Sequence, residues 1–113
     1  MQDTYETNSG AIDWLFEPEI YAAAPTVFIT HVILEVAKEN KANGFLEVCV
    51  EKKIEGAEDF VSGCFAKRNI KRNTTEKTVH FVTPMPLSGG DRLRVKFENK
   101  ANGQAKVLVM WHR

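Results

Sequence analysis

The most constraining feature of the sequence is a two-residue period in its apolar positions. Within residues 45–53 apolar side chains alternate with charged ones, and the same alternation returns within residues 92–98. Successive side chains of a β-strand point to opposite faces, so this pattern is typical of strands with one buried face. Further strands are predicted at residues 12–17, 26–38, 60–66, 78–83 and 105–111. No segment carries a 3.6-residue apolar stripe, so the pattern indicates an all-β protein.

The length of the chain limits the architecture. It has 113 residues, which is enough for one domain and too few for two of ordinary size. About seven or eight such strands bury their apolar faces as an antiparallel two-sheet β-sandwich, which we predict to be jelly-roll-like; an immunoglobulin-like sandwich and a closed barrel are the competing architectures. We assign residues 12–113 to this domain. Residues 1–11 are mostly polar, and we predict that they form an N-terminal arm outside it.

An internal repeat interrupts the strands. The hexapeptide Glu-Asn-Lys-Ala-Asn-Gly occurs at residues 39–44 and again at 98–103, and flanking residues such as Val36 and Val95 match at the same offset. Asn-Gly is a strong turn signal, and each copy lies between two alternating strands. We therefore predict two related β-hairpins, each with a three-residue turn.

The charge balance bears on the class of partner. Fifteen basic residues offset fifteen acidic ones, which argues against a nucleic-acid-binding protein, because such proteins neutralise phosphates with excess Lys and Arg. The basic run at 67–72 lacks interleaved aromatic residues, and we interpret it as a solvated loop. No apolar run approaches the roughly 20 residues of a membrane span, and the N-terminus does not resemble a secretory signal. We therefore expect neither membrane insertion nor classical secretion.

The residues that carry chemistry form no recognisable motif. Two cysteines do not make a disulfide framework, and we interpret Cys49 and Cys64 as unreactive packing residues whose usage suits a reducing compartment. His31, His80 and His112 fall on three separate predicted strands without a motif around them. Zinc-ligand spacing of the Cys-x2-Cys kind is absent. We expect no enzyme activity, no catalytic residues, no metal and no other cofactor.

Two predicted strands, at 26–38 and 105–111, are apolar on both faces, and a strand of this kind is normally covered on both faces. The cover comes either from another subunit or, within the chain, from the N-terminal segment or residues 55–75. The residues predicted to face outward, and so our interface candidates, are Val27, Ile29, Ile33, Leu108 and Met110.

A resemblance appears at residues 84–95. This stretch reads Pro-Met-Pro-Leu-Ser-Gly-Gly-Asp and continues into an alternating strand. It is similar to the penultimate hairpin of many jelly-roll proteins, including tumour-necrosis-factor-like trimers and small β-sandwich virion proteins of tailed phages. The resemblance covers only the C-terminal part of the chain and carries over no catalytic residues. It implies a structural protein of a virion.

We therefore expect a non-enzymatic structural protein of a phage virion, made in the host cytoplasm: a capsid decoration, fibre or tail component. It would form a homo-oligomer, for example a trimer, and dock on a larger assembly such as a capsid. The alternative is a carbohydrate-binding module or lectin-like adhesion domain that binds a glycan through Tyr21 and Phe45, because aromatic rings stack on sugars. A small enzyme on a β scaffold is the third hypothesis.

Overall fold

A computed structural model of the chain describes residues 1–7, 11–17, 26–37, 44–53, 56, 60–71, 74–99 and 104–113. All regular structure in these ranges is β. The strands are β1 (Gln2–Thr7), β2 (Ile12–Phe16), β3 (Thr26–Val36), β4 (Gly44–Lys53), β5 (Phe60–Ile70), β6 (Glu76–Ser88), β7 (Arg92–Asn99) and β8 (Ala105–His112).

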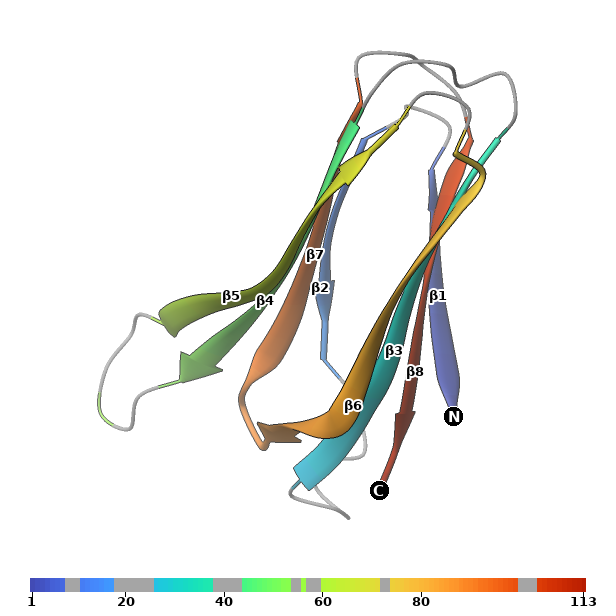
Figure 1. The fold of residues 1–113 in the computed structure, drawn as a ribbon. Helices are drawn as coiled ribbons and strands as arrows, with labels where there is room; N and C mark the ends of the chain where they lie inside the picture. The colour runs from blue at the N-terminus through green and yellow to red at the C-terminus, as the bar shows by residue number, and fades with distance from the viewer. Residues whose placement is uncertain are drawn as a thin grey trace.

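The strands form two four-stranded antiparallel sheets that face each other (Figure 1). The first sheet has the order β1-β8-β3-β6 and the second has the order β2-β7-β4-β5. Strands that follow each other in the chain mostly lie in opposite sheets, and only β4 and β5 are both consecutive and paired. This is the strand order of an eight-stranded jelly roll. The prediction of an all-β, antiparallel, jelly-roll-like sandwich is confirmed.

The two predicted hairpins are wrong. The first hexapeptide lies between β3 and β4 and the second between β7 and β8, but the members of each pair belong to different sheets. β3 pairs with β8, and β4 pairs with β7. Residues 38–43 and 100–103 lie outside the described part of the chain. Alternation shows which face of a strand is buried, but it does not show which strand lies beside it, so a crossing between sheets has the same sequence pattern as a hairpin.

The hydrophobic core fills the space between the two sheets. In β8, buried residues alternate with half-buried ones as far as Trp111, as expected for a strand with one face on the core. Each large side chain that is fully buried here contributes roughly 1.5–3 kcal/mol. The largest of them are Phe16, Phe97, Ile29, Leu34, Leu46, Leu87, Leu93, Val27, Val32, Val48, Val50 and Val95.

A β-bulge in β3 corrects two of the predicted interface residues. The register of β3 against both neighbours shifts between Ile29 and His31. Val27 and Ile29 before the bulge are fully buried, and so is Val32 after it. A bulge adds one residue to the strand, so the residues that face the core change from odd to even numbers. The prediction that Val27 and Ile29 face outward is therefore wrong.

The N-terminal residues also differ from the expectation. Gln2–Thr7 do not form an arm outside the domain, because they pair along their whole length with β8 as the edge of the first sheet (Figure 1). The N-terminal ammonium group donates a hydrogen bond to the carbonyl oxygen of Trp111 at 2.8 Å, and the backbone N–H of Trp111 donates to the carbonyl oxygen of Met1 at 3.0 Å. An edge strand can remain polar because its backbone, not its side chains, joins it to the sheet.

Gly44 offers a test of the packing between β4 and β7. A Cβ atom at Gly44 would lie 2.6 Å from Cε1 of the buried Phe97 and 2.8 Å from the carbonyl oxygen of Glu98. We expect Gly44→Ala to lower the free energy of unfolding by about 1–3 kcal/mol in urea denaturation, because neither neighbour can move freely. Gly63→Ala in β5 is the matched control, since no atom lies within 4 Å of its Cβ position. Equal losses in the two variants would contradict this packing.

Candidate functional site

The two sheets present chemically different outer faces. We call the outer side of the second sheet the charged face, because side chains of β2, β7 and β4 form ion pairs across it. We call the outer side of the first sheet the apolar face, because Ile33, Leu108 and Met110 lie at its centre.

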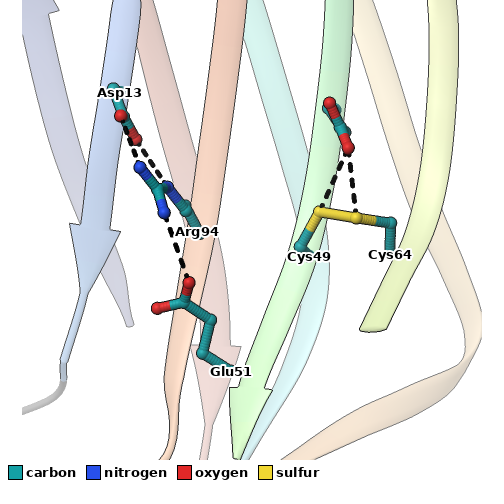
Figure 2. The surroundings of a disulfide bond; sticks show 6 residues. Asp13, Cys49, Glu51, Cys64 and Arg94 are labelled. Atoms are coloured by element: carbon teal, nitrogen blue, oxygen red, sulfur yellow. Dashed lines mark hydrogen bonds and ion pairs between the residues drawn. A yellow bond between two sulfur atoms is a disulfide. The ribbon is translucent and has the colours of Figure 1, made fainter. Parts of the chain in front are cut away.

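A chain of ion pairs links neighbouring strands across the charged face (Figure 2). The Arg94 guanidinium binds both oxygens of Asp13, at 2.8 Å and 2.7 Å, and reaches Oε2 of the buried Glu51 at 3.4 Å. Arg92 Nε donates to the other oxygen of Glu51 at 2.6 Å. The hydrogen bond from Arg94 holds the pKa of Asp13 below its ordinary value, and the same contact raises the pKa of Arg94. These groups bind one another and connect three strands.

A disulfide bond joins β5, an edge strand of the second sheet, to its neighbour β4. Cys49 on β4 and Cys64 on β5 are in register and bonded through their sulfur atoms (Figure 2). The interpretation of both cysteines as unreactive packing residues is corrected by this bond. Glu47 Oε1 lies 3.6 Å from Cys49 Sγ and 3.1 Å from Cys64 Sγ. Since the chain has two cysteines, the bond leaves no thiolate to act as a nucleophile or to coordinate a metal.

The disulfide also bears on the compartment. Disulfides persist in oxidising surroundings, which include secreted proteins and virion surfaces, and are rare in reducing ones. The bond is of a kind typical of oxidising surroundings, whereas the cysteine usage alone suits a reducing compartment. The pairing could not be read from the sequence, because a bulge between Val48 and Cys49 sets the register that brings the two sulfur atoms together.

Reduction provides a test of the bridge. It links residues 15 positions apart, and closing a loop of that size lowers the entropy of the unfolded chain, which stabilises the folded state by about 3 kcal/mol. We expect a reducing agent to lower the free energy of unfolding by about that amount, measured by urea denaturation. The double variant Cys49→Ser with Cys64→Ser should unfold like the reduced protein and should not respond to the reducing agent. Two titratable thiols in the untreated native protein would contradict the bond.

The apolar face gathers the remaining interface candidates. Ile33 on β3 pairs in register with Leu108 on β8, and Met110 lies two residues further along β8. All three are half-buried. Neither segment considered as a cover lies over them, because β1 is beside β8 at the sheet edge and β5 belongs to the other sheet. In the described part of the chain, the apolar face is therefore uncovered.

A groove runs along the side of the sandwich where β1 and β2 are the edges. Trp14 lines this groove and stacks on Tyr5, with ring centroids 5.8 Å apart. The indole N–H of Trp111 is buried and has no hydrogen-bond partner among the described residues, which is unusual for a buried donor. The groove is lined by Met1, Gln2, Asp3, Thr4, Trp14, Leu15, Phe16, Glu17 and Trp111.

Of the two aromatic residues predicted to bind a ligand, Phe45 is not among the residues that line this groove. Phe45 is half-buried on β4, opposite Glu98 and Asn69. Tyr21 lies outside the described residues. The structure instead brings Tyr5 and Trp14 together, from two strands in different sheets, and no spacing in the sequence indicated that pair.

Comparison with protein-family models, with curated proteins and with solved structures finds no match to this chain. Among the described residues, no helix is long and apolar enough to cross a membrane.

Proposed function

We propose that this chain is a non-enzymatic structural protein that self-associates through its apolar face. The observation that carries the proposal is the half-buried set Ile33, Leu108 and Met110, on an outer face that no described strand covers. Apolar side chains gathered on an outer face often mark an interaction site, and burying them against a partner removes their surface from solvent.

A second copy of the chain fits this face on grounds of charge. Beside the Ile33–Leu108 pair, Nζ of Lys106 lies 4.0 Å from Oε1 of Glu6 and 3.7 Å from Oε2 of Glu35. One end of the apolar set is thus bordered by paired charges, and the whole chain has no net charge that would keep copies apart. An apolar centre with a polar border is the usual composition of a homo-oligomeric interface.

The concrete form that we propose is a virion component, such as a capsid decoration, fibre or tail protein that docks on a larger particle. Three points support it. Jelly rolls are the architecture of many viral capsid domains, the segment at 84–95 resembles that of phage virion proteins, and a disulfide suits a virion surface. The first two points are analogies of fold and sequence, which leave the particle unspecified.

The self-association is tested by light scattering across a dilution series. We expect the native protein to have the mass of an oligomer. Leu108→Asp should raise the dissociation constant at least about 100-fold, because the interface would bury an unpaired carboxylate. Leu15→Asp is the matched control, since Leu15 is a 39% exposed leucine on the charged face, opposite Arg94. A native monomer at every concentration, or equal effects of both variants, would refute the proposal.

The edge groove favours a second candidate function, the binding of a glycan. The Tyr5–Trp14 stack offers aromatic surface to the apolar side of a sugar ring. The carboxylates of Asp3 and Glu17, which line the groove, offer acceptors for the hydroxyl groups of a sugar. Jelly rolls also occur as lectin domains.

A glycan array tests this second function. If the groove binds sugars, Trp14→Ala should abolish the signals, because it removes half of the aromatic stack. Phe45→Ala is the control, because Phe45 is another half-buried aromatic residue and does not line the groove. An array without hits, or hits that depend on Phe45 and not on Trp14, would exclude the groove as a glycan site.

A further inference from the structure

We propose that His31 and His80 form a binding site for a divalent transition-metal ion such as Zn²⁺ on the outer surface of the first sheet. This inference does not rest on the proposed function, because it concerns two side chains within one copy of the chain. It also goes beyond the sequence analysis, in which no spacing of ligands indicated a metal.

The fold brings the two histidines together from distant parts of the sequence. β3 and β6 are neighbours in the first sheet (Figure 1), and His31 is the register partner of His80. Their imidazole rings are stacked, with centroids 4.5 Å apart and ring planes 5° from parallel. His31 is half-buried and His80 is exposed, so in a single copy the pair is open to an ion from solvent; His31 is the register partner of Met110, so the pair adjoins the apolar face.

A chain of hydrogen bonds determines which nitrogen of His31 is free. The Thr30 hydroxyl donates to the carbonyl oxygen of Met110 at 3.2 Å, and its oxygen lies 3.0 Å from His31 Nδ1. Since the hydroxyl proton is already given to the carbonyl, Thr30 must accept, and His31 Nδ1–H is the donor. The lone pair of neutral His31 is then on Nε2. Metal-binding histidines are typically held in this way by a hydrogen bond from the other nitrogen.

The two rings lie close enough to share an ion once one of them turns. Zn²⁺ binds imidazole nitrogen at about 2.0–2.1 Å, so two tetrahedral ligand atoms lie roughly 3.3 Å apart. Because the ring planes are nearly parallel, the in-plane lone pairs do not converge in the stacked arrangement, and the exposed His80 has to rotate about its side-chain bonds so that both nitrogens face one ion. Imidazole nitrogen suits Zn²⁺, Cu²⁺ and Ni²⁺ rather than Mg²⁺ or Ca²⁺. Water molecules complete the coordination.

His112 provides a matched control within the same protein. Its Nδ1 donates to the carbonyl oxygen of Arg113 at 2.8 Å, which leaves Nε2 free as in His31. It stacks on Phe28, with centroids 5.4 Å apart, instead of on a second imidazole. It therefore has the same free nitrogen but only one ligand to offer.

The test is isothermal titration calorimetry of the full chain with zinc chloride in a buffer that does not bind metal. We expect saturable binding, a loss of at least about tenfold in affinity for His31→Ala and for His80→Ala, and no change for His112→Ala. Thr30→Val should weaken binding by about tenfold, because it removes the hydrogen-bond acceptor and keeps the shape of the side chain. Circular dichroism confirms that each variant is folded.

Two results would overturn the inference. One is the absence of saturable zinc binding by the native protein. The other is a loss of affinity in His112→Ala as large as that in His31→Ala, which would show that any surface histidine suffices. A nitrogen-detected NMR spectrum gives an independent reading: His31 should carry its proton on Nδ1 before zinc is added, and its Nε2 resonance should shift on addition.

Discussion

The antiparallel pairing of β3 with β8 is the contact on which the rest of this structure depends. On the inner side it sets Leu34 opposite Val107, both fully buried, in the middle of the core. On the outer side the same ladder sets Ile33 opposite Leu108 and creates the apolar face. β1 and β6 attach to the free edges of this pair, where β1 carries Tyr5 of the aromatic stack and β6 carries His80 of the histidine pair.

The class of fold could be predicted from the sequence, whereas the pairing could not. The alternation at 92–98 reports a strand with one buried face, and the structure has β7 there with Leu93, Val95 and Phe97 buried. The same alternation is compatible with any neighbouring strand. The Asn-Gly turn signal then favours pairing with the next strand in the chain, as in a hairpin. In a jelly roll most connections pass from one sheet to the other, and the partner of a strand is then far away in the sequence.

The candidate sites were harder to predict, because each depends on register. The adjacent polar residues Thr30 and His31 interrupt the apolar alternation of β3, and they mark the bulge that buries Val27 and Ile29. That signal was present in the sequence. No such signal marks the disulfide or the histidine pair, because the position of one member says nothing about the strand that carries the other.

The internal repeat gives a reason to assign different roles to the two outer faces. The two hexapeptides begin 59 residues apart, and four pairs of inward-facing residues with the same separation are identical: Leu34 with Leu93, Val36 with Val95, Val48 with Val107 and Val50 with Val109. Outward-facing residues do not. Ile33 corresponds to Arg92, and Met110 corresponds to Glu51, so the apolar face stands where its counterpart carries an ion pair. The core needs only volume and hydrophobicity and tolerates one pattern used twice. An outer face that has to remain in water has no need of apolar residues, so their presence on one face alone favours that face as the interface.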